Sequence, residues 1–183
     1  TGIPTSIDIG SEYRYRKDKP VNNSIGIVVS QSGETMDTLE CLKKFKQHNI
    51  FTISIVNVLS SSIARMSDYI LPTVAGPEIG VASTKAFTSQ LAVLALLALH
   101  IKKNNMENID YAKDTIFQSL FKIHQTMRRI LNNSKKFEEV AHSLRDAKSI
   151  FYIGRGPMYP LALEGALKLK EITYKHCEGY AAG

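Results

Sequence analysis

Three hydroxyl side chains and an amide gather in residues 30–35, Ser-Gln-Ser-Gly-Glu-Thr. A phosphate monoester needs several hydrogen-bond donors that converge on its oxygens, preferably at the positive end of a helix dipole. Ser30, Ser32 and Thr35 supply hydroxyls, and the glycine between them permits close backbone approach. The alternative is an ordinary helix start that Ser32 caps and Glu34 complements. Capping needs only one hydroxyl, so we interpret the segment as an anion site; without Gly-Lys-Ser/Thr it is not a nucleotide P-loop.

A second segment, residues 78–85, combines small residues with two neighbouring hydroxyls (Glu-Ile-Gly-Val-Ala-Ser-Thr-Lys). Ser83 or Thr84 suits the N-cap of the helix expected to follow, which accounts for one of the hydroxyls. Gly80 and Ala82 would let a ligand lie against the backbone. On local sequence alone, a ligand loop and a capped helix start both stay open.

A third set, Glu164, Lys168 and Glu171, has the i, i+4, i+7 spacing that places side chains on one face of a helix. Such a face is commonly an exposed stripe of salt bridges. A carboxylate held near a lysine can also act as a general base beside a carbonyl group. The spacing does not decide between the two roles.

Other polar residues are less informative. Arg14 and Arg16 could contact an anion or a neighbouring subunit. His176 and Cys177 are adjacent, but nothing completes a catalytic triad, so we assign them surface or packing roles. Because Cys41 is the only other cysteine, we expect no disulfide framework, metal site or cofactor.

Short apolar runs rich in β-branched residues alternate with helical patterns along the chain. Strands are expected over residues 6–9, 24–29, 51–56, 69–72 and 149–153, and helices over 35–48, 60–66, 83–102, 111–131, 134–147 and 159–174. Continuous apolar runs are typical of parallel strands. The alternation therefore predicts an α/β fold with a doubly wound parallel sheet and helices on both faces, whose ligands bind along the edge where the strands end.

The βαβ pattern restarts near residue 149 after a polar connection around residues 102–105. One strand and one helix do not make an independent sheet. We therefore expect a first domain over residues 1–106, and connecting helices with the beginning of a second domain over residues 107–183.

Composition limits the possible partners. The 183 residues carry a net charge of +6, but the lysines and arginines are scattered, which argues against nucleic-acid binding. No apolar run reaches the roughly 20 residues of a membrane-spanning helix, and the N-terminus lacks the pattern of a signal peptide. With two cysteines only, we expect a cytoplasmic protein without a membrane partner.

At these residues the chain resembles the sugar isomerase (SIS) domain proteins, which have a flavodoxin-like fold. The resemblance is closest to the isomerase part of the glucosamine-6-phosphate synthases (glutamine–fructose-6-phosphate aminotransferases), which contains two SIS domains. It rests on residues 11–16, 30–35, 78–87 (EIGVASTKAF), 154–156, 159–160, 163–172 (LEGALKLKEI) and 180–183. The segments 78–87 and 163–172 are more specific to the synthases than 30–35, which occurs across SIS proteins.

The resemblance implies a role for each candidate residue. The sugar phosphate would be held by Ser30, Gln31, Ser32 and Thr35, and the sugar chain would be lined by Val81 and Ser83. Glu164 and Lys168 would contact the sugar, and Glu171 would move a proton between C1 and C2. The implied reaction converts fructose 6-phosphate and ammonia from glutamine to glucosamine 6-phosphate without a cofactor. The implied partners are a glutaminase domain of the same protein and a second subunit in a homodimer.

The chain also departs from the family. The glutaminase domain is absent from this sequence, and the first strand of the first SIS domain, with its Gly-Thr-Ser loop, would precede Thr1. After Gly183 the family continues to a histidine implicated in ring opening and a lysine that forms a Schiff base. The chain thus resembles part of a longer enzyme, incomplete at both ends, and we expect activity to require those missing groups.

Three rival functions differ in their features. A sugar-phosphate-sensing module would have the hydroxyl-rich loop without a proton-moving carboxylate, which Glu171 argues against. A related deglycase or aldose–ketose isomerase would not be expected to carry both synthase-like segments. Nucleic-acid binding would fall steeply with added salt.

Overall fold

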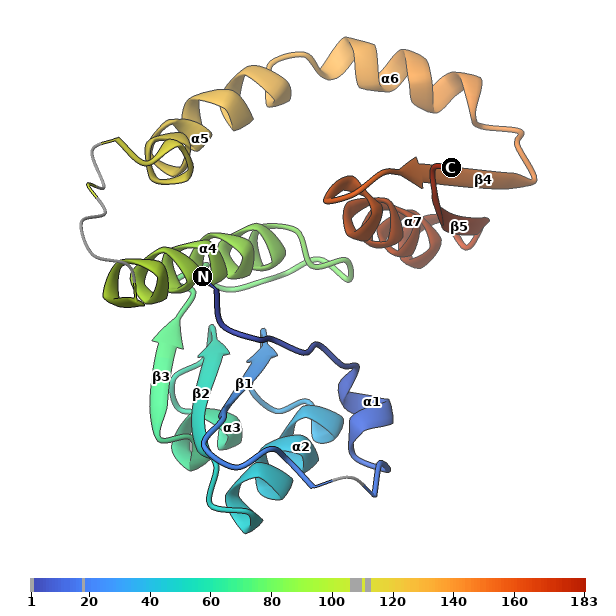
Figure 1. Ribbon diagram of the computed structural model, residues 1–183. Coiled ribbons are helices and arrows are strands. Elements are labelled where there is room, and N and C mark those ends of the chain that lie inside the picture. Colours follow the sequence, from blue (N-terminus) through green and yellow to red (C-terminus); the bar gives the residue numbers. More distant parts are fainter. Residues whose placement is uncertain (1, 18, 106–109, 111–112) are drawn as a thin grey trace. The chain divides into compact units, whose positions relative to one another are not determined.

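A computed structural model describes residues 2–17, 19–105, 110 and 113–183 (Figure 1). The chain divides into two compact units. The first comprises Thr1–Glu78 and Thr84–Gln118, and the second comprises Ile79–Ser83 and Ser119–Gly183. The domain boundary expected between residues 106 and 107 lies outside the described residues.

The first unit contains a parallel sheet of three strands in the order β1 (Ile25–Ser30), β2 (Phe51–Val56) and β3 (Tyr69–Pro72). Its register pairs Ser30 with Val56, and Val56 with Pro72. The three strands therefore end at the same edge, and the loops that follow them meet there.

Two helices, α2 (Met36–Gln47) and α3 (Ser62–Met66), pack on this sheet. Apolar residues at helical spacing in α2 place Leu42 in a core with residues from β1, β2 and α3, namely Val28, Val56, Ile63 and Ala64. Along β1 the buried residues alternate with partly exposed ones, as the period of two in a strand requires. Burial of this apolar set fixes the position of the loop between β1 and α2.

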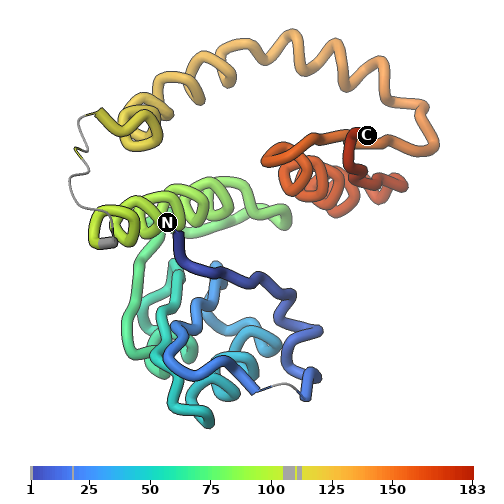
Figure 2. The backbone as a smooth tube through the Cα atoms, in the orientation of Figure 1, coloured from blue at the N-terminus to red at the C-terminus, as the bar shows by residue number. Residues whose placement is uncertain are grey.

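The N-terminal segment differs from our expectation. The strand predicted at residues 6–9 is wrong: Figure 2 shows this N-terminal segment as an irregular path, and it pairs with no strand among the described residues. The Ile7 side chain is 99% exposed. A short helix α1 (Gly10–Tyr13) follows instead. The Tyr13 ring lies 5.4 Å from the Phe45 ring, and the Lys44 ammonium lies 4.5 Å from the Tyr13 ring. Packing on α2 thus holds this segment in place.

Helix α4 (Lys85–Asn105) completes the first unit. By length and composition alone, its residues Lys85–Asn104 could cross a membrane, although the sequence led us to expect no such segment. One helix of this kind is weak evidence, because core helices of soluble proteins have the same composition.

The second unit contains α5 from Ser119 onward, α6, β4, α7 and β5. Their bounds are α5 Thr115–Leu131, α6 Ser134–Ser143, β4 Ser149–Gly154, α7 Met158–Thr173 and β5 His176–Ala181. The expected start of α5 at Tyr111 lies outside the described residues; α5 begins at Thr115, where the Asp114 carboxylate accepts hydrogen bonds from the N–H groups of Ile116 and Phe117. An aspartate in this position is a favourable N-cap.

Strands β4 and β5 are parallel, and α7 connects them. We did not predict β5, because His-Cys-Glu-Gly-Tyr-Ala contains no β-branched residue. It forms by pairing along the whole of β4, from Ser149 opposite His176 to Gly154 opposite Ala181. A Cβ at Gly179 would lie 2.9 Å from Leu163 Cα, so α7 lies directly on β5. The second unit is therefore a complete βαβ unit and not a strand with a helix.

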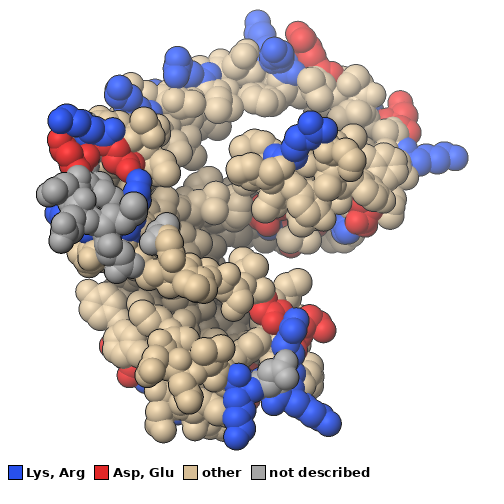
Figure 3. Space-filling view, in the orientation of Figure 1, with Lys and Arg blue, Asp and Glu red and all other residues tan. Residues whose placement is uncertain are grey.

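Figure 3 shows Lys and Arg side chains in separate groups on several elements, with uncharged surface between them. The face shown thus has no continuous basic stripe along the described residues, the usual footprint of a protein that binds a nucleic-acid backbone.

A partly exposed polar network links Lys46 of α2, Thr52 of β2 and Asp68, the residue before β3, and it predicts a pH dependence of stability. Lys46 Nζ and both the N–H and the hydroxyl of Thr52 donate to the Asp68 carboxylate. These hydrogen bonds, of which that from Lys46 has the largest effect, lower the pKa of Asp68 from 3.8 to about 2. The stabilisation is therefore complete above pH 3.8 and is lost as the pH falls towards 2.

We expect Asp68→Asn to lower the free energy of unfolding at neutral pH and to flatten its decline between pH 4 and pH 2. Urea denaturation at several pH values measures both effects. Asp146→Asn, at an exposed residue of the second unit, is the matched control. An unchanged pH profile in Asp68→Asn would contradict the assignment.

Candidate functional site

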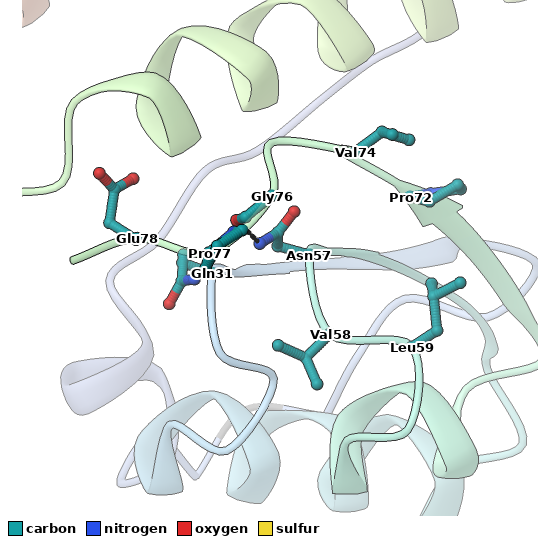
Figure 4. A pocket seen from close by; sticks show the side chains of 9 residues that line it. All are labelled: Gln31, Asn57, Val58, Leu59, Pro72, Val74, Gly76, Pro77 and Glu78. Atoms are coloured by element: carbon teal, nitrogen blue, oxygen red, sulfur yellow. Dashed lines mark hydrogen bonds between the residues drawn. The ribbon is translucent and has the colours of Figure 1, made fainter.

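The loops that follow β1, β2 and β3 enclose a cleft of about 670 Å³ at the edge where these strands end. It is lined by Gln31, Asn57, Val58, Leu59, Pro72, Val74, Gly76, Pro77 and Glu78 (Figure 4). Open α/β sheets bind their ligands at this edge.

The loop Ser30–Thr35, which we call the cradle loop, is folded by its own hydroxyls. Ser30 is buried, and its Oγ accepts the Gly33 N–H at 3.0 Å and lies 2.9 Å from Thr35 Oγ1. Ser32 Oγ accepts the Glu34 N–H at 3.2 Å. Ser30, Gln31, Ser32 and Thr35 therefore lie in one compact turn.

Gly33 brings this turn against α3. Its φ of 68° lies in the left-handed region that favours glycine, and a Cβ there would lie 1.9 Å from Ser61 Oγ. The Gly33 carbonyl also accepts the Ile63 N–H at 3.0 Å. The backbone of the cradle loop is thus fixed from two sides.

Helix capping does not explain the hydroxyls of this loop. Ser32 binds the Glu34 N–H within the loop, and the N-cap residue of α2 is Thr35. The Thr35 side chain makes no capping hydrogen bond within the part of the chain that the structure describes. The start of α2 is therefore free of the side-chain cap that its N-cap residue could supply, and a helix start in this state suits an anion.

Two carboxylates in and beside the cradle loop, those of Glu34 and Asp37, form hydrogen bonds with other residues. Glu34 Oε1 accepts the Ser62 N–H at 2.8 Å, and this hydrogen bond lowers the pKa of Glu34. Asp37 pairs with Arg14 at 2.5 Å, and the hydrogen bond raises the pKa of Arg14. Pairing with cations or N–H groups weakens the repulsion that free carboxylates would exert on a bound anion.

The two arginines whose role the sequence left open both form ion pairs. Arg14 binds Asp37, and Arg16 Nε lies 2.8 Å from Asp8 Oδ2. Arg14 therefore supports the cradle loop indirectly, by neutralising a carboxylate in the first turn of α2.

A second loop, Thr73–Glu78, forms the opposite wall of the cleft, and Asn57 organises it. Asn57 Oδ1 accepts the Ala75 N–H at 2.8 Å and the Thr73 hydroxyl at 3.1 Å, and its Nδ2 donates to the Gly76 carbonyl at 2.7 Å. Sequence reasoning missed Asn57. The available signal was its position directly after β2, at the ligand edge of the sheet.

Glu78 ends the second loop and holds the start of α4, because its Oε2 accepts the Ala86 N–H at 3.0 Å. We expected Ser83 or Thr84 to cap this helix. Helix α4 begins at Lys85, so Thr84 is its N-cap residue, and Glu78 accepts a further N–H of the first turn. Val81 is 90% exposed, whereas Ser83 is partly buried. Both belong to the segment Ile79–Ser83, which is grouped with the second unit.

Glu164, Lys168 and Glu171 lie together on one face of α7. Lys168 Nζ is 2.8 Å from Glu171 Oε2 and 3.5 Å from Glu164 Oε1. Burial acts to lower the pKa of Lys168, but the hydrogen bond to Glu171 and the charge of Glu164 outweigh it and raise this pKa. The lysine is therefore a stable cation between two carboxylates, and Glu171 remains accessible at 35% side-chain exposure.

Of the remaining candidates, Cys177 is completely buried in β5 and His176 is exposed. The structure thus forms two groups of candidate residues, one in the cradle loop of the first unit and one on α7 of the second. A cradle that binds an anion and a carboxylate that accepts a proton are the two chemical functions they offer.

Comparison with known proteins shows which family the chain is similar to. The SIS domain family model matches residues 1–100 and 143–183. Two relatives named glutamine–fructose-6-phosphate aminotransferase [isomerizing] are similar to this chain. The protein from Bartonella quintana is 49% identical over 176 residues, and that from Bradyrhizobium diazoefficiens is 48% identical over 181 residues. These alignments cover 96% and 99% of this chain but 29% and 30% of the relatives, so the chain spans about 30% of their length.

Solved structures show the same likeness. The C-terminal domain of glucosamine-fructose-6-phosphate aminotransferase from Francisella tularensis has a TM-score of 0.93 and 43% identity, over 98% of this chain and 51% of that one. A putative phosphosugar isomerase from Clostridium difficile has a TM-score of 0.75 and 25% identity, over 93% and 48% of the two chains. The α/β fold expected from the sequence is thereby confirmed.

Proposed function

The chain belongs to the SIS domain family, and from this premise we propose that its first unit binds a sugar phosphate through the cradle loop. The observation that carries the proposal is the compact turn of three hydroxyls at the start of α2, where Thr35 leaves the helix uncapped. Its position at the carboxyl edge of a parallel sheet supports the same conclusion.

For the longer protein, we propose glutamine–fructose-6-phosphate aminotransferase activity with isomerisation. Relatives of that name align with 96–99% of this chain at close to half identity. The substrate would be fructose 6-phosphate, the nitrogen source ammonia from glutamine released in a glutaminase domain, and the product glucosamine 6-phosphate. We further propose that the longer protein is a cytoplasmic homodimer that binds neither nucleic acid nor membranes.

The arrangement on α7 supports a role for Glu171 as the base that moves a proton between C1 and C2. Lys168 binds Glu171 through Oε2, and Oε1 has no hydrogen bond to other residues that the structure describes. One carboxylate oxygen is thus oriented by the lysine while the other can take a proton. Glu164 and Lys168 are proposed to contact the sugar, as are Val81 and Ser83.

The binding proposal is tested by titrating the protein with fructose 6-phosphate and glucosamine 6-phosphate in a calorimeter. Ser32→Ala removes one hydroxyl of the cradle loop and should weaken both affinities by about 10-fold or more, the usual cost of a hydrogen bond to a charged group. Ser24→Ala is the matched control, because Ser24 lies just before β1, at the opposite end of that strand. Equal affinities in the two variants, or no binding by the unmodified protein, would contradict the proposal.

A further inference from the structure

Asn57 joins the two loops of the cleft. Its backbone N–H donates to the Gln31 carbonyl of the cradle loop at 3.1 Å, while its side chain makes the three hydrogen bonds to the loop Thr73–Glu78. Figure 4 shows Asn57 between the two walls, with its bond to Gly76 drawn as a dashed line. One residue therefore fixes the spacing of the cradle loop and the second loop.

The chemistry of this position requires an asparagine. The Ala75 N–H can only donate, and the Gly76 carbonyl can only accept, so the side chain must offer an acceptor and a donor on opposite sides. An aspartate would accept from Ala75 but would turn a charge towards the Gly76 carbonyl. An aliphatic side chain would make none of the three bonds.

The second loop needs this support, because its backbone is strained. Val74 has a φ of 51°, in the left-handed region that a β-branched residue rarely adopts. Such a conformation persists only where the surroundings determine it. The bonds of Asn57 to Thr73, Ala75 and Gly76 lie on both sides of Val74 and supply that constraint.

The second loop is also held at its C-terminal end. Glu78 closes the second loop by binding the Ala86 N–H of α4, and the segment with Val81 and Ser83 lies between Glu78 and α4 in the sequence. We propose that Asn57 is a positioning residue that holds the second loop for the sugar part of the ligand, while the cradle loop holds the phosphate. This inference rests on the proposed function, which it deepens.

The test compares two probes, fructose 6-phosphate and inorganic phosphate, on the same variants. Asn57→Leu should weaken fructose 6-phosphate binding about 10-fold and leave inorganic phosphate affinity within about twofold, because only the sugar contacts lose their support. Calorimetry measures the affinity for fructose 6-phosphate. The shifts of the Gly33 and Glu34 amide resonances in an NMR titration measure the affinity for inorganic phosphate. The Ala75 amide resonance should also shift, since its acceptor is lost.

Two further variants keep the outcome decisive. Asn22→Leu, an exposed asparagine of the first unit, is the matched control and should change neither affinity. Thr73→Val removes one of the three hydrogen bonds without altering Asn57. It should weaken fructose 6-phosphate binding more than inorganic phosphate binding, by a smaller factor than Asn57→Leu. This variant tests the positioning role if Asn57→Leu does not fold.

The two proposals fail in different ways. Equal loss of both probes in Asn57→Leu, or no loss of either, would overturn the positioning role while Ser32→Ala could still weaken both. Failure of the unmodified protein to bind fructose 6-phosphate, or full affinity in Ser32→Ala, would overturn the proposed function itself.

Discussion

Replacing Glu171 by glutamine is expected to lower the isomerisation rate by about 10³-fold, within the range that general acid–base catalysis contributes. Glutamine keeps the size of the side chain and can still hydrogen-bond, but it cannot accept a proton from carbon. Lys168 would retain Glu164 as an ion-pair partner at 3.5 Å, so the local fold of α7 should persist. Affinity for fructose 6-phosphate should therefore stay within about twofold.

The measurement is conversion of fructose 6-phosphate to glucosamine 6-phosphate by the longer protein that carries this chain, together with calorimetric binding. Glu178→Gln is the matched control, because Glu178 belongs to the same unit and pairs with Lys170 at 3.1 Å. That variant should keep the full rate. If Glu171→Gln lost binding and rate to the same extent, Glu171 would be a ligand for the sugar and not the base.

The second large effect is expected from Gly33→Ala, which should destabilise the first unit by about 3–5 kcal/mol and abolish sugar-phosphate binding. Two costs combine at this position. The φ of 68° is unfavourable for alanine, and the new Cβ would lie 1.9 Å from Ser61 Oγ and 2.5 Å from Ser61 Cβ. Either α3 or the cradle loop must move, and the hydroxyls of the loop then no longer converge.

Gly76→Ala separates the two costs. Gly76 has nearly the same φ, 69°, but nothing lies within 4 Å of the position that its Cβ would take. That variant should lower the free energy of unfolding by only about 1–2 kcal/mol, the cost of an alanine with a positive φ. Thermal or urea unfolding measures both variants, and equal losses would show that the contact with Ser61 is not responsible for the larger effect.

Local patterns were sufficient for most of the regular elements. Strand β2 was indicated by its run of β-branched residues, and helix α2 by the spacing of Leu39, Leu42 and Phe45. In both elements the sequence pattern itself shows which face is buried. The same kind of pattern failed at residues 6–9, where two isoleucines alternate with polar residues but pair with no strand among the described residues. It also failed at β5, whose strand conformation depends on its partner β4.

The cradle loop could be predicted because its functional groups are consecutive in the chain. Three hydroxyls within residues 30–35, between a strand and a helix, allow few arrangements, and the hydrogen bonds that these hydroxyls make within the loop connect residues no more than five apart. Glu164, Lys168 and Glu171 were equally visible, because helix geometry alone places them on one face. Their shared face followed from local spacing, whereas their proposed roles came from the family resemblance.

The second loop and its support depended on the tertiary structure. Asn57 reaches residues 16 to 19 positions away, and Glu78 reaches Ala86 across the start of α4, so no local pattern indicates either contact. The sequence by itself thus determined the fold class, the position of the cradle loop and the shared face of Glu164, Lys168 and Glu171, because each depends on residues that are close in the chain. Only the parallel register of β1, β2 and β3 decided which residues flank the cradle loop, because it brings the three strand ends to one edge.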